Sequence, residues 1–141
     1  MTRDRNEGGE PARVTTGPLS PGRIERHCAE AAMRGAQCLR VDLEGCADKQ
    51  ELLARISDAL AFPDWFGGNW DALFDCLNDM SWMPAEGYLL VLENADEFLR
   101  DSPEAFAVAR SIFEDAAAAW HARGVEMSVL VDATPPTHQG A

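Results

Sequence analysis

The sequence predicts an α/β fold with a small, mainly parallel, three-stranded sheet packed with helices. Stretches with strand character at 37–43, 87–93 and 125–131 are separated by stretches with helical periodicity. Strands that alternate with helices pair in parallel through right-handed crossovers. The chain has 141 residues, of which 46% are hydrophobic, so it can bury one core and is too apolar for general disorder.

Glycine and proline mark the expected limits of the folded unit. Residues 1–20 are rich in both and show no apolar period, so we expect a flexible tail there. Residues 134–141 have the same character, and we expect a second flexible tail. A single domain is therefore expected over residues 21–133.

The first elements of this domain are a helix and a strand. Ile24, Cys28 and Ala31 form a weak apolar stripe that predicts a helix over 21–34. Apolar residues then give strand character to 37–43.

Two further helices are expected to begin at capping residues. Asp48 can cap a helix over 48–60, with Glu51 three residues further on. A loop rich in aromatic residues and glycine follows at 63–68. Asn69 then opens a second helix, which we expect to run to about residue 78.

The remaining elements are a strand, a long helix and a last strand. An uninterrupted apolar run at 87–93 predicts a strand that is buried on both faces. Ser102 and Pro103 predict a helix start, with the hydroxyl as the cap and the proline where its missing N–H costs nothing. This helix is expected to reach Ala122 and to lead into a strand at 125–131.

The charge of the chain restricts its partners. There are 24 acidic residues and 12 Lys plus Arg, which gives a formal net charge of −12. A negative field disfavours nucleic acid and anionic membranes, because both are bound by cations. No stretch approaches the roughly 18 apolar residues of a membrane span, and the first ten residues lack the apolar core of a secretion signal. We therefore expect a cytoplasmic protein with a basic partner and no nucleic acid or membrane.

Four cysteines are present: Cys28, Cys38, Cys46 and Cys76. They contain no CxxC pair and show no ligand spacing with the histidines. Reduced, mostly buried thiols are the expected state, with disulfides or a zinc site as the alternatives.

The stretch 62–79 concentrates the candidate functional residues. On a helical wheel its acidic residues fall on one polar arc, namely Asp71, Asp75 and Asp79. Like charges four residues apart repel each other. No nearby Lys or Arg in the sequence offsets this repulsion, because the chain between Arg55 and Arg100 contains nine acidic residues and no Lys or Arg.

Aromatic side chains lie beside this acidic arc. They are Trp65, Phe66, Trp70 and Phe74, and not all of them can lie in the core. Exposed tryptophan beside a charge cluster is typical of an interface hot spot. Gly67 and Gly68 let a partner's backbone approach closely, or they simply make the turn before the helix. The hypothesis is a protein-binding surface, and the alternative is a solvated acidic face that serves solubility.

Catalytic and metal-binding interpretations are weaker. Asp71 and Asp75 could act as paired carboxylates on a glycoside, but no pocket is implied that would separate their pKa values. Calcium loops take ligands from irregular chain, and no EF-hand, zinc, nucleotide or nucleophile motif occurs. We therefore expect that the protein is not an enzyme and that it has no catalytic residue, no bound metal and no cofactor.

A longer pattern runs through the same stretch: Pro63, Trp65-Phe66-Gly67, Asn69, Asp71-Ala72-Leu73 and Asp75-Cys76-Leu77. In this pattern, and in its flanking strands, the chain resembles the barstar family of intracellular ribonuclease inhibitors over about residues 38–132. The resemblance implies an immunity-type protein that plugs the active site of a small basic ribonuclease, with carboxylates in the places of RNA phosphates. Complexes of this family are the standard example of electrostatic steering and of a dominant aspartate hot spot.

The resemblance also assigns individual roles. The family's two principal aspartates match Asp71 and Asp75, its anchoring aromatic matches Trp65, and a supporting acid matches Asp115. The expected partner-binding residues are Trp65, Gly67, Asn69, Trp70, Asp71, Phe74, Asp75 and Asp115.

The chain departs from the family pattern in places. The family commonly has tyrosine where Trp65 stands and an aliphatic residue where Trp70 stands, and the best-known member has glutamate where Asp115 stands. Residues 1–37, with their extra N-terminal helix, have no counterpart in that member. The alternative function is a barstar-like module for another basic protein, either regulatory or ribosome-associated.

Overall fold

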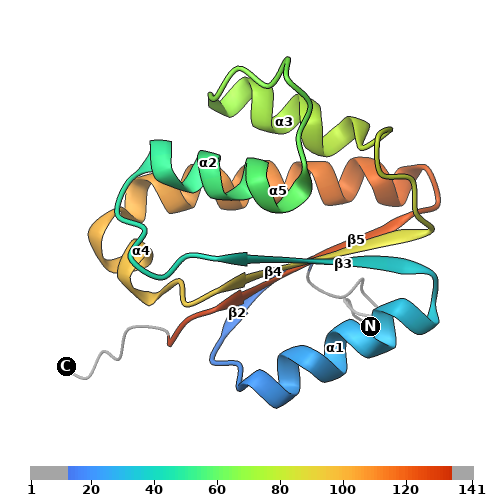
Figure 1. Cartoon of the computed structure of the whole chain (residues 1–141), viewed down its shortest axis with the longest axis horizontal. Coiled ribbons are helices and arrows are strands. Elements are labelled where there is room, and N and C mark those ends of the chain that lie inside the picture. The colour runs from blue at the N-terminus through green and yellow to red at the C-terminus, as the bar shows by residue number, and fades with distance from the viewer. Residues whose placement is uncertain (1–12, 135–141) are drawn as a thin grey trace, which may run out of the picture.

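The computed structural model describes residues 13–134 (Figure 1). Expectations for residues 1–12 and 135–141 lie outside the described residues. The elements, in chain order, are β2 (Val14–Gly17), α1 (Pro21–Met33), β3 (Ala36–Asp42), α2 (Lys49–Leu60), α3 (Trp70–Asp79), β4 (Gly87–Glu93), α4 (Asp96–Asp101), α5 (Pro103–Ala122) and β5 (Glu126–Asp132). The mixed α/β class and the parallel sheet are confirmed, and so is the helix that precedes β3.

The sheet has four parallel strands in the order β2-β5-β4-β3, so the expectation of three strands is wrong. The additional strand, β2, lies within the segment that we expected to be a tail. It pairs with β5, with Val14 opposite Val129 and Gly17 opposite Asp132. Only Val14 of its four residues is buried, so its sequence carries little of the apolar pattern that identifies a strand.

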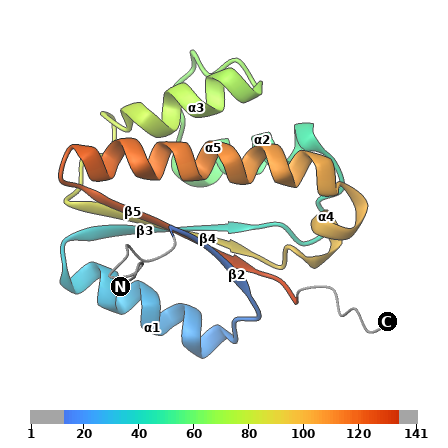
Figure 2. The same cartoon turned by 180° about the vertical axis from the view of Figure 1, so that it is seen from behind.

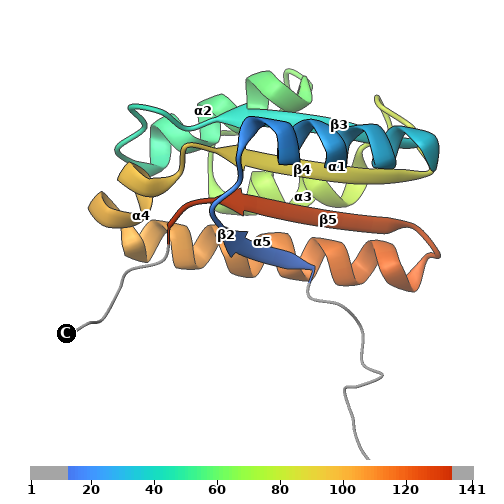
Figure 3. The same ribbon diagram turned by 90° about the horizontal axis from the view of Figure 1, so that it is seen from below.

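The helices form layers on the two sides of the sheet. α2 and α5 cover one face, and α3 lies outside them as the outermost layer (Figures 1 and 2). α1 lies on the opposite face, where it packs along β3 and β4, while β5 and β2 lie beside it (Figure 3). α3 and α1 are therefore the outermost helices on opposite sides of the sheet.

Both faces of the sheet are buried at its centre. Leu90 and Leu92 of β4 point to the main core, which also contains Phe98 and Phe113. Leu89 and Val91 point to a second, smaller core under α1, formed with Ile24 and Ala31. The apolar run at 87–93 therefore forms the doubly buried strand that its sequence predicts.

A disulfide joins Cys28 of α1 to Cys38 of β3, with their Cα atoms 5.4 Å apart. The expectation of four reduced thiols is wrong for this pair, because the turn between α1 and β3 brings the two residues together across ten positions of the chain. The other two cysteines, Cys46 and Cys76, are free and buried.

One of the two predicted side-chain caps on α2 and α5 is present. The Asp48 carboxylate accepts a hydrogen bond from the Glu51 backbone N–H (2.9 Å), as expected for the start of α2. The Ser102 hydroxyl does not cap α5 and instead donates to the Ala47 carbonyl at 2.6 Å. Ser102 is also the C-cap residue of α4, a short helix that the sequence did not indicate. Its side chain therefore links the junction of α4 and α5 to the loop that precedes α2.

Two kinds of feature are absent from residues 13–134. No helix in this range has the length and apolar character needed to cross a bilayer. No group of three or more His, Cys, Asp and Glu side chains in this range could hold a metal ion.

Candidate protein-binding surface

The N-terminus of α3 is fixed by Asn69. Its side-chain Oδ1 accepts a hydrogen bond from the Ala72 backbone N–H at 2.8 Å, and its own carbonyl accepts from the Leu73 N–H at 3.0 Å. Gly68, just before it, has φ +71°, a conformation that side chains other than glycine rarely adopt. The sequence Gly68-Asn69 thus sets the direction in which α3 leaves the loop.

Replacing Asn69 by alanine is expected to destabilise the fold by about 1 kcal/mol, because the Ala72 N–H loses its partner. The free energy of unfolding from urea titration measures this effect. Asn69→Ser keeps a capping oxygen and should retain most of the stability. An Asn69→Ala variant as stable as the wild type would show that the cap contributes nothing.

The inner side of α3 is bound to the rest of the protein by packing and by hydrogen bonds. Leu73 and Leu77 are completely buried in the main core. At the C-terminal end, the Trp120 indole N–H donates to the Leu77 carbonyl (2.7 Å), and the Arg123 guanidinium donates to the Asn78 carbonyl (3.1 Å). A cation at this end also suits the helix dipole. α5 therefore satisfies carbonyls that α3 cannot satisfy internally.

The outer side of α3 presents three carboxylates. Asp71, Asp75 and Asp79 are all exposed, as the helical wheel predicts. Between residues 13 and 134, none of them has a hydrogen bond or an ion pair. Their mutual repulsion is therefore unrelieved in the isolated chain and would be relieved by a cationic partner.

Cys76 lies between these carboxylates along the helix but points inward. Burial, and to a smaller extent the charges of Asp79 and Asp75, together raise the pKa of its thiol to about 11. Burial likewise raises the pKa of Cys46. Both thiols are therefore held in the protonated, unreactive form.

We expect neither free thiol to react with a thiol reagent in the native protein at neutral pH. Both cysteines are completely buried, and a thiol of pKa about 11 is roughly one part in ten thousand thiolate at pH 7. Reaction with Ellman's reagent should detect no thiol in the native chain, two after unfolding, and four after unfolding with a reductant. Four reactive thiols without reductant would contradict the disulfide.

The loop before α3 is held by a cluster of four aromatic rings, Phe62, Trp65, Phe66 and Trp82. The rings of Phe62 and Phe66 have centroids 4.9 Å apart, and Trp82 meets Phe62 edge-on at 5.8 Å. The Trp82 indole N–H is fixed by the Leu60 carbonyl at 3.0 Å. Trp65 packs edge-on against Trp82 at 6.3 Å but remains 56% exposed. The aromatic cluster therefore supports Trp65 from behind and leaves much of its ring available.

Trp82 was missed by the sequence reasoning. Its relevance depends on a contact with Trp65 across 17 positions of the chain, which no local pattern shows. The available signal was composition, because three of the four tryptophans fall within residues 65–82.

The other expected aromatic residues differ in their exposure. Phe74 is 39% exposed on α3. Trp70 is half-buried against the main core, and the Lys49 ammonium lies 5.3 Å from its ring centroid. The structure therefore gives Trp70 a packing role, and only part of its ring is available to a partner.

Gly67 and Asp115 complete the expected set. A Cβ added to Gly67 would meet the Asn69 side-chain nitrogen at 3.4 Å, an ordinary contact, so the fold itself does not require glycine there. Gly67 is exposed, which is consistent with close approach by a partner. Asp115 is exposed on α5, the helix against which α3 packs.

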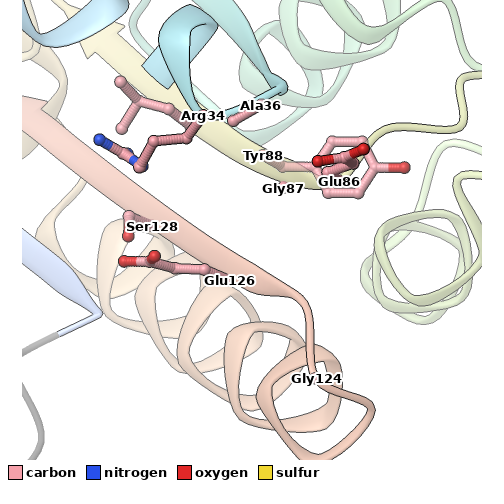
Figure 4. A pocket seen from close by; sticks show the side chains of 9 residues that line it. Arg34, Ala36, Glu86, Gly87, Tyr88, Gly124, Glu126 and Ser128 are labelled. Carbon is pink, nitrogen blue, oxygen red and sulfur yellow. The ribbon is translucent and has the colours of Figure 1, made fainter. Parts of the chain in front are cut away.

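Two clefts among the described residues lie away from α3 and contain none of these residues. One, of about 240 Å³, lies at the beginnings of the strands between Arg34, Glu86, Tyr88 and Glu126 (Figure 4). The other, of about 190 Å³, is lined by residues of α1, β2 and β5. The expected residues instead form an exposed helix and loop. We call Trp65, Asp71, Phe74, Asp75 and Asp79 the α3 face.

Comparison with known proteins identifies the family. A family model described as Barstar (barnase inhibitor) matches residues 36–132, which is more than half of the chain. No curated protein matches the chain. The matched segment extends from β3 to the end of β5 and contains the whole α3 face, whereas β2 and α1 precede it. The chain therefore belongs to the barstar family.

Proposed function

We propose that this protein is an intracellular, immunity-type inhibitor that covers the active site of a small basic ribonuclease with the α3 face. At the family level, barstar proteins are ribonuclease inhibitors of the barnase-inhibitor type rather than enzymes. One observation supports the proposal most strongly. Three exposed carboxylates on α3 lack a cationic partner among the described residues and lie beside exposed aromatic rings.

The chemistry of inhibition follows from these groups. A ribonuclease active site offers arginine, lysine and histidine side chains that bind the phosphates of RNA. Carboxylates one helical turn apart can occupy such positions and form charge-assisted hydrogen bonds. Once water is excluded, these bonds become stronger because the local dielectric constant falls.

Charge and packing act on different rate constants. The net charge of −12 attracts a basic enzyme and raises the association rate. Trp65 and Phe74 present apolar surface that can be buried on contact, which slows dissociation. Asp71 lies in the first turn of α3, where the helix dipole favours a carboxylate.

The proposal predicts stoichiometric inhibition. Titration of the full chain into RNA-cleavage assays of a panel of small basic ribonucleases should end at one inhibitor per enzyme for at least one of them. The association rate should fall as salt is added, because screening weakens long-range attraction. A chain that inhibits none of the panel, while binding another basic protein through Asp75, would contradict the proposal and support the alternative module.

A further inference from the structure

Two loops flank α3, one between α2 and α3 over residues 61–69 and the other between α3 and β4 over residues 80–86 (Figure 1). The helix separates these loops along the chain, but they meet through one side chain, Trp82 of the second loop. Its ring meets Phe62 edge-on at 5.8 Å and Trp65 edge-on at 6.3 Å, and both of these residues belong to the first loop. Trp82 therefore connects the loop that carries Trp65 to the segment that follows α3.

The position of Trp82 is fixed by its backbone and by its side chain. The Met83 backbone N–H donates to the Met80 carbonyl at 3.0 Å, which closes a turn with Trp82 inside it. The Tyr88 hydroxyl donates to the Met83 carbonyl at 2.8 Å and ties this turn to β4. The Trp82 indole N–H donates at 3.0 Å to the carbonyl of Leu60, the last residue of α2, where helix carbonyls lack partners within the helix. The ring of Trp82 is therefore a fixed support.

The side chain of Trp65 is held by fewer interactions. The Phe66 backbone N–H donates to the Pro63 carbonyl at 3.0 Å, so the backbone of Trp65 also lies in a closed turn. Its indole N–H has no hydrogen bond within residues 13–134, and the residue is 56% exposed. Aromatic pairs prefer particular geometries, of which edge-to-face is one. The contact with Trp82 is therefore the directional interaction that orients the Trp65 ring.

We propose that Trp82 is a positioning residue of the binding surface, which holds the Trp65 ring of the free protein in the orientation that a partner meets. The proposal rests on the proposed function, because it takes Trp65 as a partner-binding residue. A side chain that has to be immobilised when a complex forms lowers the affinity, whereas a ring that is already oriented avoids this cost. Trp82 acts through Trp65 and does not touch the partner.

A purely structural role of Trp82 makes a different prediction. Trp82 packs against the main core together with Phe62 and Phe66, and a residue that only filled the core would loosen its surroundings in general when truncated. A positioning residue would release the Trp65 ring and leave the other tryptophans, Trp70 and Trp120, as they are. The mobility of the individual indole rings therefore separates the two roles.

Nitrogen-15 relaxation of the indole N–H groups in the full chain measures this mobility without any partner. The chain has four tryptophans and should give four indole signals, of which Trp65→Phe identifies that of Trp65. In Trp82→Leu the order parameter of the Trp65 indole should fall from about 0.85, typical of a rigid group, to below about 0.6. Trp120→Leu is the matched control, because it removes another half-buried tryptophan that packs against the main core and should leave the Trp65 value unchanged.

The conservative variant Trp82→Phe keeps an aromatic ring but loses the indole N–H that binds the Leu60 carbonyl. Its Trp65 order parameter should lie between those of the wild type and Trp82→Leu. Circular dichroism and urea titration check that each variant is folded under the conditions of measurement. A Trp65 order parameter that stays at the wild-type value in Trp82→Leu would overturn the proposal. An equal fall at Trp70 and Trp120 would overturn it as well, because Trp82 would then only support the core.

A double-mutant cycle measures the consequence for binding. Against a small basic ribonuclease that the chain inhibits, Trp82→Leu should raise Kd roughly two- to tenfold, mainly through faster dissociation. In a Trp65→Ala background the same substitution should change Kd less than about twofold, because no ring is left to position. Equal losses in the two backgrounds would show that Trp82 touches the partner itself and would overturn the proposal. If the chain inhibits no ribonuclease, the proposed function fails, and the relaxation measurement still decides whether Trp82 orients Trp65.

Discussion

Replacement of Asp75 by alanine should weaken binding to the proposed ribonuclease target by about 2–5 kcal/mol, which is roughly 30-fold to several-thousand-fold in Kd. This range is typical for the truncation of one partner of a buried, hydrogen-bonded charge pair in a protein interface. Asp75 is exposed in the middle of the acidic arc, one helical turn from both Asp71 and Asp79. Its removal would leave buried cations of the enzyme without a partner. Isothermal titration calorimetry measures the loss.

The same substitution should leave folding stability almost unchanged. The Asp75 side chain has no hydrogen bond or ion pair within residues 13–134, and its loss removes two repulsions of a few tenths of a kcal/mol. Glu104→Gln is the matched control, because it removes an exposed negative charge from the first turn of α5, outside the α3 face. An Asp75→Ala variant that binds as tightly as Glu104→Gln would show that Asp75 is not a binding residue.

Replacement of Phe113 by alanine should destabilise the protein by about 3–5 kcal/mol. Phe113 is completely buried on α5, the helix that lies between the sheet and α3. Truncation leaves a cavity in the main core and loosens the layer that carries the α3 face. The midpoint and slope of a urea titration give the change in the free energy of unfolding.

Val108→Ala is the control on the same helix. Val108 is 41% exposed, so its truncation should change stability by no more than about 0.5 kcal/mol. Equal effects of the two substitutions would mean that the core does not depend on α5 in the way the packing indicates.

The elements that the sequence predicted well are those whose identifying residues are close together in the sequence. β4 is a continuous apolar run, and its observed bounds coincide with those predicted. α3 starts where its capping residue, Asn69, predicts, since the cap is a contact across only three positions. The exposed position of Asp71, Asp75 and Asp79 follows from helical geometry alone.

The elements that the sequence did not predict depend on distant partners. β2 is held by backbone pairing with β5, more than a hundred residues away along the chain. Its own side chains form almost no apolar pattern that would identify a strand. The Cys28–Cys38 disulfide needs α1 to be seated on the sheet. Ser102 has the chemistry of a cap, but its hydroxyl donates to the Ala47 carbonyl, 55 positions away along the chain, and makes no capping hydrogen bond to α5.

The candidate surface shows the same division. Its outward residues could be named from the sequence, although their roles in binding stay predictions. The residues that position it could not be named, because Trp82 and Arg123 act through contacts with Trp65 and with the end of α3. A residue that binds a partner is recognised by its own chemistry, whereas a supporting residue is recognised by what it touches.

The position of α3 outside the α2 and α5 layer has a consequence for how this protein can evolve. Leu73 and Leu77 are constrained by the core, but Asp71, Phe74 and Asp75 on the same helix face away from it. Mutations on the outer side can therefore alter which partner is recognised without disturbing the scaffold. Selection for a new target and selection for a stable fold act on alternate positions of one ten-residue helix, so a lineage can follow changes in its partner without rebuilding its core.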